Sequence, residues 1–396
     1  MQSSEPSLNA RRQLRRQWHL AGAWGVPFIG SAFWLLLEHG GLAAALQGGL
    51  QTAAVLMYGW VRWGRALALN HPPQEPRLQP SLGAANWLSL LRGGLIAVLA
   101  GFVFQPALSD ESPAGWVAWA PAALYIAAVA LDGVDGFLAR VSGSATCLGE
   151  FLDTEIDALG LLIAAALVVW IGKAPAAYLC VGVGYYALRA AVGARRKAGR
   201  PIAPVHPRAE ARLVAGCEMG FAGAALLPLF EPAATRPVAL IMTAALLVGF
   251  ARDWLIVCGH ATADGRPLIR RLERAEREIA RLLPVALRAA AVAGIVVLVG
   301  RSPAGEGAVS LSTAGCALLA TCAALLAFGV MTRMAGLAAS VTVARAVAGP
   351  IPGIEWGVVL GCGVVLVMTG AGDLKLWQPE DRFFMKRLGG HAPPGP

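Results

Sequence analysis

The sequence predicts an all-α integral membrane protein that crosses the bilayer several times. Apolar residues make up 57% of its 396 residues, and the mean hydropathy is +0.59. Only 14% of the residues are charged, against about 25% in a typical soluble domain. Apolar runs of roughly 15 to 20 residues recur from about residue 24 to 371, close to the roughly 20 helical residues that cross a hydrocarbon core. Because backbone amides in lipid must be bonded within their own segment, these runs are predicted to be helices.

The distribution of the positive charges predicts the orientation in the membrane. The net charge of +9 does not indicate nucleic-acid binding, because the cations lie at the ends of apolar runs. If the N-terminus is cytoplasmic, the outer loops contain only the cations Lys173, Arg236 and Arg301, as the positive-inside rule requires. We therefore expect a bacterial inner (cell) membrane protein. The seven cysteines have no paired spacing, so neither a disulfide framework nor a zinc site is indicated.

Four segments follow from composition. Residues 1–83 contain a basic tail, about two apolar runs and a proline-rich linker. Residues 84–258 contain six predicted spans. Residues 259–284 are predicted to form an amphipathic helix on the cytoplasmic side, ended by Pro284. Residues 285–396 contain four further predicted spans and a polar tail.

Four aspartates gather where two predicted spans, 115–131 and 156–172, approach each other. Asp132 and Asp135 are three residues apart, and Asp153 and Asp157 are four apart, so each pair lies on one face of a helix. Carboxylates this close to hydrocarbon are retained when they are paired, bound to metal or facing water. An oxygen-only ligand set suits Mg²⁺ or Mn²⁺. The stretch is therefore predicted to hold divalent cations.

Other residues near the aspartates suit a phosphate-bearing ligand. Arg140 offers a planar fork for phosphate oxygens, while Gly136 and Gly149 let a bulky ligand approach the backbone. A basic loop at 193–212 has two interpretations. It either anchors topology and attracts anionic lipid, or it binds a phosphorylated acceptor through Arg195, Arg208 and Arg212.

The aspartates belong to a longer pattern, D-x-x-D-G-x-x-A-R-x₈-G-x₃-D-x₃-D, which the chain fits at all eight fixed positions. This pattern resembles the signature of the CDP-alcohol phosphotransferases (CDP-alcohol phosphatidyltransferases). The upstream segment from Asn86 to Arg92 also resembles the start of that family's first span, with Ser89 where threonine is more usual. The resemblance covers about residues 84–258 and implies a six-helix catalytic core with extra transmembrane helices on both sides.

The resemblance implies a function and a set of roles. A phosphoalcohol group, expected to be phosphatidyl from CDP-diacylglycerol, would pass to an alcohol acceptor with release of CMP, in phospholipid biosynthesis. Asp132, Asp135, Asp153 and Asp157 would form a two-metal centre with Mg²⁺ or Mn²⁺, and Asp157 would also be the general base. The CDP-donor pocket would include four further residues: Gly136, Ala139, Arg140 and Gly149. We expect a homodimer surrounded by membrane lipids, with no nucleic-acid partner. Its site is expected to face the cytoplasm.

Two other functions use similar residues. An intramembrane aspartate-rich prenyltransferase also binds a lipid diphosphate with Mg²⁺, but such enzymes usually have two separated aspartate motifs on distant helices. A non-enzymatic divalent-metal transporter would place acids near the middle of several spans, whereas here they lie at one edge. The C-terminal block resembles the small DoxX-like membrane proteins and is interpreted as an accessory domain, either supporting the core or carrying a second function.

Overall fold

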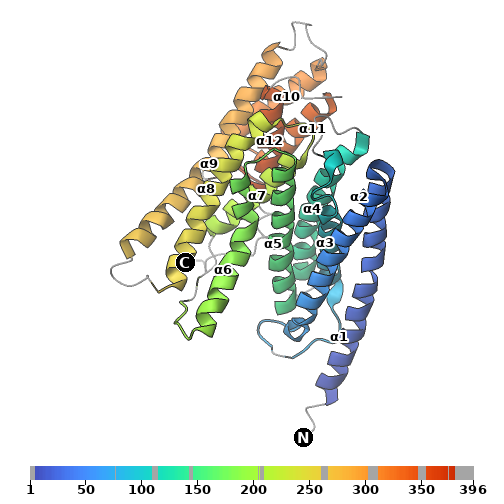
Figure 1. The fold of residues 1–396 in the computed structure, drawn as a ribbon. Coiled ribbons are helices and arrows are strands. Elements are labelled where there is room, and N and C mark those ends of the chain that lie inside the picture. Colours follow the sequence, from blue (N-terminus) through green and yellow to red (C-terminus); the bar gives the residue numbers. More distant parts are fainter. Residues whose placement is uncertain are drawn as a thin grey trace. The chain divides into compact units, whose positions relative to one another are not determined.

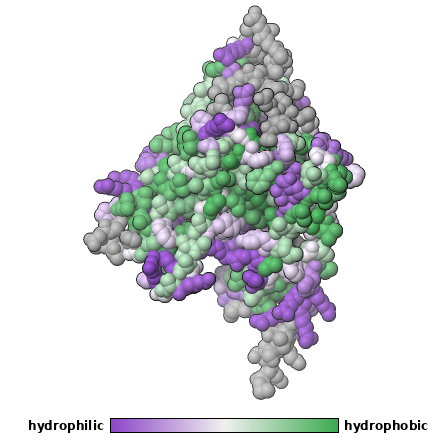
Figure 2. Space-filling view, viewed as in Figure 1, coloured by the Kyte–Doolittle hydropathy of each residue, from purple (hydrophilic) through white to green (hydrophobic). Residues whose placement is uncertain are grey.

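The computed structural model describes residues 5–75, 77–108, 115–141, 146–203, 205, 209–259, 266–301, 311–346, 354–372 and 374–379. Throughout these ranges the regular elements are helices, apart from one isolated bridge between Val330 and Trp377 (Figure 1). Five helical stretches are long and apolar enough to cross a membrane, and four shorter helices are also apolar. Hydrophobic side chains cover much of the surface seen in Figure 2. The predicted all-α polytopic fold is confirmed.

The chain forms two compact units, Met1–Ile171 and Gly172–Lys386. The division falls inside the predicted six-span segment 84–258, after the third of its six α-helices. The aspartate stretch lies wholly in the first unit, and the basic loop 193–212 lies in the second. The four-segment division of the chain stays a prediction.

The first unit begins with a helical hairpin that precedes the six-span segment. Helix α1 spans Glu5–Ala23 and α2 spans Gly25–Gly64. Gly41 breaks α2 with a non-helical φ of 70°, a conformation open to glycine, and the chain turns back there (Figure 1). Antiparallel pairing follows from the contacts: Trp18 lies against Gly64, and Trp60 lies against Gly22. The two predicted N-terminal spans therefore pack on each other.

Three helices complete the first unit: α3 (Gly83–Ala100), α4 (Ala120–Val141) and α5 (Cys147–Trp170). Helix α3 packs against α2, α4 and α5. The proline-rich linker before it contains a short 3₁₀ turn, η1 (Leu67–Leu69). Asn70 ties this linker together, since its side-chain amide donates to the carbonyls of Gln79 and Ser81. Two more 3₁₀ turns, η2 (Pro106–Leu108) and η3 (Gly115–Ala118), precede α4.

The second unit begins with the short turn η4 (Ala176–Tyr178) and contains seven helices in the described residues. They are α6 (Leu179–Lys197), α7 (Ala209–Leu226), α8 (Pro232–Val257), α9 (Arg266–Arg301), α10 (Thr313–Phe328), α11 (Thr332–Ala346) and α12 (Ile354–Thr369). Buried apolar residues of α7, α9, α10, α11 and α12 form one core. Within it the buried guanidinium of Arg288 donates to the carbonyls of Leu326, Ala327 and Ala371, which joins α9 to the ends of two neighbouring segments.

The predicted break at Pro284 is not observed, because α9 runs through this residue from Arg266 to Arg301. A proline inside a helix removes one backbone hydrogen bond, and such a loss is tolerated in membrane helices when neighbouring groups compensate. Here the turn after α12 lies against the proline ring, with Gly372 close to Pro284. The amphipathic stretch and the following predicted span are therefore one helix.

Candidate active site

Three aspartates and one arginine from three helices meet in the first unit. Asp132 lies on α4, and Asp153 and Asp157 lie one turn apart on α5. One carboxylate oxygen from each lies within 4.8 Å of the others. From α3, Arg92 reaches all three aspartates: Nη1 lies 2.7 Å from Asp132 and 3.0 Å from Asp153, and Nη2 lies 2.5 Å from Asp157. The convergence predicted for these aspartates is thus present, with an arginine at its centre.

The packing of α5 explains why its two aspartates face this point. Leu148, Leu152 and Ile156 are buried one turn apart, and the stripe continues up the helix. Asp153 and Asp157 each follow one of these residues, so they lie at the edge of the buried face. Sequence spacing alone therefore directs both carboxylates to one side of the helix.

Exposure differs sharply between the arginine and the aspartates. The Arg92 side chain is 2% exposed, whereas those of Asp132, Asp153 and Asp157 are 37%, 50% and 29% exposed. The guanidinium therefore forms the floor of the cluster, and the carboxylates remain open on their other side. In the ionised form that binds metal, the three carboxylates exceed the single guanidinium by two negative charges. Hard oxygen donors with that excess fit a divalent cation such as Mg²⁺ or Mn²⁺.

Four predicted site residues on α4 cannot be placed in the same detail. The backbone of α4 continues to Val141, so this half of the motif is helical. The side chains of Asp135, Ala139 and Arg140 lie outside the described residues, as does the surrounding of Gly136. Their metal and CDP-pocket roles stay predictions.

The start of α5 shows a packing reason for Gly149. Thr146 caps the helix, its hydroxyl accepting from the Gly149 backbone amide at 3.1 Å. Asn86 of α3 donates to the same hydroxyl at 3.4 Å. A Cβ on Gly149 would lie 2.8 Å from Asn86 Oδ1, closer than real Cβ contacts allow. Gly149 therefore leaves room for the Asn86 side chain, which joins α3 to the start of α5. This packing role is separate from the CDP-pocket role predicted for Gly149.

Two features of this site are not evident from the sequence. Arg92 lies in the upstream segment that resembles the start of the family's first span, outside the aspartate motif. Its ion pairs with the aspartates arise from the packing of α3 against α4 and α5. Glu155, between the two aspartates of α5, is 1% exposed and faces α2, which precedes the family-like segment. Arg62 of α2 lies 3.6 Å from its carboxylate, and the Tyr58 hydroxyl donates to it at 3.4 Å.

The residues predicted to bind the acceptor lie in the second unit. Arg195, near the end of α6, donates to the carbonyls of Pro201 at 3.0 Å and Cys258 at 3.4 Å, so it joins the ends of α6 and α8. Arg208 and the side chain of Arg212 lie outside the described residues. The contacts of Arg195 support a structural role, and the acceptor-binding role stays a prediction.

Comparison with known families bears on the segment that contains this site. Residues 82–262 match the model of the CDP-alcohol phosphatidyltransferase family. This match agrees with the family resemblance of the motif, and the matched segment includes α3 to α8 and all eight fixed positions of the pattern. Searches of curated proteins and of solved structures gave no match. The family implies a transferase that moves a phosphoalcohol group from a CDP-alcohol, typically with divalent metals.

Proposed function

We propose that the protein transfers a phosphatidyl group from CDP-diacylglycerol to an alcohol and releases CMP, in phospholipid biosynthesis at the cytoplasmic face of the inner membrane. The observation that supports this most is the set of three open carboxylates within 4.8 Å of one another, inside a segment of the CDP-alcohol phosphatidyltransferase family. A lipid donor suits a chain whose helices are apolar enough to lie in a bilayer. The donor's diphosphate would then lie at the headgroup level.

The residues that would hold the metal are Asp132, Asp153 and Asp157, together with Asp135 by the motif. When bound, divalent cations would neutralise the diphosphate and stabilise the attacking and leaving oxygens. Arg92 would keep the three described carboxylates in register, because one buried guanidinium contacts all of them. Gly136, Ala139, Arg140 and Gly149 would shape the pocket for the CDP group.

Asp157 would accept the proton of the acceptor hydroxyl as the alcohol oxygen forms a bond to the β-phosphorus. The bond between that phosphorus and the bridging oxygen breaks, and its electron pair leaves with CMP. A carboxylate is only a weak base. A general base beside a bound divalent cation needs little basicity of its own, because the positive charge of the cation also acidifies the attacking alcohol hydroxyl. The chain's own contribution is to orient this carboxylate through its contact with Arg92.

The alternatives differ in what they require of the carboxylates. A prenyltransferase would require a second aspartate cluster on distant helices, and a transporter would require acids along a path through the spans. Among the described residues, one cluster of three potential metal ligands occurs, at the junction of α4 and α5. The phosphotransferase proposal accounts for that single cluster.

Donor and acceptor are tested together by product analysis with purified protein in detergent. Labelled CDP-diacylglycerol and Mg²⁺ or Mn²⁺ are supplied with glycerol 3-phosphate, inositol phosphate, inositol, serine or choline in turn. A new labelled phospholipid with one acceptor supports the proposal and identifies that acceptor. Absence of product with every acceptor, in a preparation that does convert CDP-choline and diacylglycerol, would reassign the donor.

A further inference from the structure

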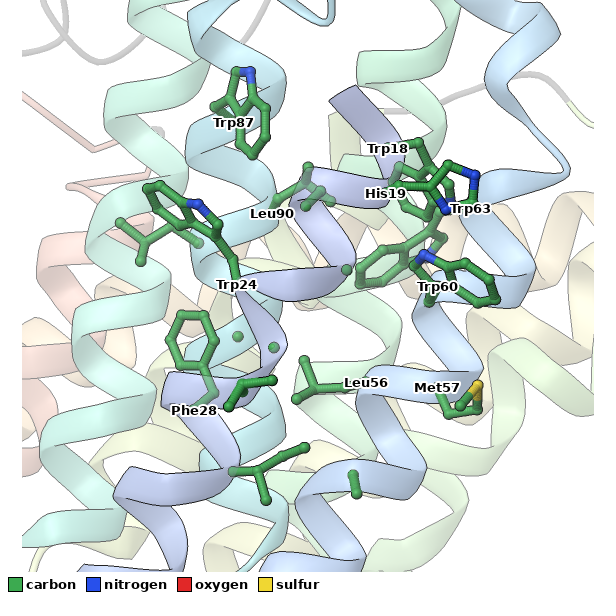
Figure 3. Close-up of a pocket in the computed structure, with 18 residues that line it drawn as sticks. Trp18, His19, Trp24, Phe28, Leu56, Met57, Trp60, Trp63, Trp87 and Leu90 are labelled. Atoms are coloured by element: carbon green, nitrogen blue, oxygen red, sulfur yellow. The ribbon is translucent and has the colours of Figure 1, made fainter. Parts of the chain in front are cut away.

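A cavity of about 380 Å³ lies in the first unit on the side of α3 away from the aspartates. It is lined by the end of α1, by both the N-terminal and the C-terminal parts of α2, and by one face of α3 (Figure 3). Its walls are mostly apolar, and five tryptophans line it: Trp18, Trp24, Trp60, Trp63 and Trp87. A volume of this size falls within the range of about 300–1,000 Å³ typical of ligand pockets.

Glycines leave the space in which aromatic rings of this cavity pack against the neighbouring helices. The indole nitrogen of Trp60 would lie 2.8 Å from a Cβ on Gly22, and Phe28 covers Gly94. Trp24 and Trp87 contact each other on one side of the cavity, with ring centroids 5.7 Å apart, and Trp60 lies on the opposite side in Figure 3. The aromatic walls therefore come from close packing between helices, which makes the cavity a preformed feature of the fold.

A second cavity of about 320 Å³ adjoins the first at its N-terminal end, and it is basic. Arg11 and Arg15 of α1 line it together with Arg65, which follows α2. The two cavities are neighbours on either side of one contact, in which Trp18, which lines the first, lies against Gly64, which lines the second. Along α1 the arginines precede Trp18 by one to two turns. Within the described part of the chain, no carboxylate pairs with any of these three arginines.

The combined shape has three cations at one end and an aromatic, apolar interior at the other. That is the complement of an anionic glycerophospholipid, which joins a phosphate to acyl chains. Arginine forks suit phosphate oxygens, and tryptophans are favoured where headgroups meet acyl chains. We infer that this groove between α1, α2 and α3 binds one anionic phospholipid, phosphate against Arg11, Arg15 and Arg65 and an acyl chain between the tryptophans. This inference is independent of the proposed reaction.

Diffuse attraction of basic residues to an anionic membrane is the competing explanation, and a charge-matched pair of variants separates the two. The first variant replaces the groove arginines (Arg11→Gln, Arg15→Gln, Arg65→Gln). The control replaces three exposed arginines of the same region that do not line the cavity (Arg12→Gln, Arg16→Gln, Arg77→Gln). Both lose three positive charges, so diffuse attraction weakens equally in both.

The measurement is native mass spectrometry of the full chain in a neutral detergent. Equimolar phosphatidylglycerol and phosphatidylcholine with identical acyl chains are the probes. We expect one tightly retained phosphatidylglycerol on the wild-type protein and on the control, and an affinity weakened about tenfold or more in the groove variant. The Asp157→Asn protein should retain the lipid like the wild type, which separates this site from the aspartate cluster.

Three outcomes would overturn the inference. They are equal retention of the two lipids by the wild type, equal loss in both arginine variants, and loss in Asp157→Asn instead of the groove variant. A change in the ratio of monomer to dimer without any change in bound lipid would instead assign the groove to a second copy of the chain. Elution volume and helical content of each variant verify that it is folded.

Discussion

Replacing Arg62 by methionine should destabilise the first unit and slow the reaction, although Arg62 lies outside the family-matched segment. Its partner Glu155 is 1% exposed, while Arg62 itself is 31% exposed and 3.6 Å away. Breaking a fully buried pair costs about 3–5 kcal/mol, and an exposed pair contributes about 0–1 kcal/mol. Since only one partner is fully buried and Tyr58 still donates to it at 3.4 Å, we expect a loss of about 2 kcal/mol.

The assay is the free energy of unfolding in detergent, combined with a double-mutant cycle. Glu155→Gln removes the buried negative charge that faces Arg62, so the double variant should recover much of the stability lost in Arg62→Met. Arg16→Met, on the exposed face of α1, is the matched control and should change stability by less than about 0.5 kcal/mol. A coupling energy below about 0.5 kcal/mol between Arg62 and Glu155 would refute the argument.

Three further predictions follow from other contacts. Arg92→Met should lower the free energy of unfolding by about 1–3 kcal/mol without metal, a value discounted for the exposure of its three partners. Mg²⁺ should then raise the melting temperature of this variant more than that of the wild type, and equal increases in a thermal scan would contradict the prediction. Gly149→Ala should lose about 1 kcal/mol of unfolding free energy by displacing Asn86 from the helix cap, whereas Gly193→Ala, with open space around it, should be neutral or stabilising; similar values would contradict the cap argument. Burial lowers the pKa of Lys173 to about 8 from 10.5, so the unfolded chain binds more protons between these values. Stability should therefore rise by about 2–3 kcal/mol from pH 8 to 10, and a rise of the same size in Lys173→Met would exclude this cause.

Local spacing was enough to predict which aspartates come together. The separations of Asp132 from Asp135 and of Asp153 from Asp157 are helical, and the short connection between α4 and α5 keeps the two helices adjacent. Each of these inferences uses contacts within about 26 residues of sequence. Helical periodicity and hydropathy therefore carried the fold class and the core of the site.

Longer-range contacts could not be predicted in the same way. Arg92 is 40 residues before Asp132, and its place among the aspartates depends on how α3 packs against α4 and α5. Glu155 lies between the two site aspartates of α5, but packing against α2 buries it, and no local signal indicates that contact. Pro284 was expected to end a helix, but α9 continues through it, with Gly372 lying against its ring. In each case the observed arrangement involves residues far apart in the sequence.

The most direct test of the central claim is CMP release from CDP-diacylglycerol by the purified protein, with and without a divalent cation. The wild type should release CMP with Mg²⁺ or Mn²⁺ and stop when EDTA is added. Asp157→Asn should lose activity by at least about 100-fold, in line with removal of a general base. Glu150→Gln removes the same charge from an exposed position of α5 and should stay active. CMP release that survives EDTA, or that persists in Asp157→Asn, would contradict the assignment of the aspartate cluster as the metal-dependent catalytic centre.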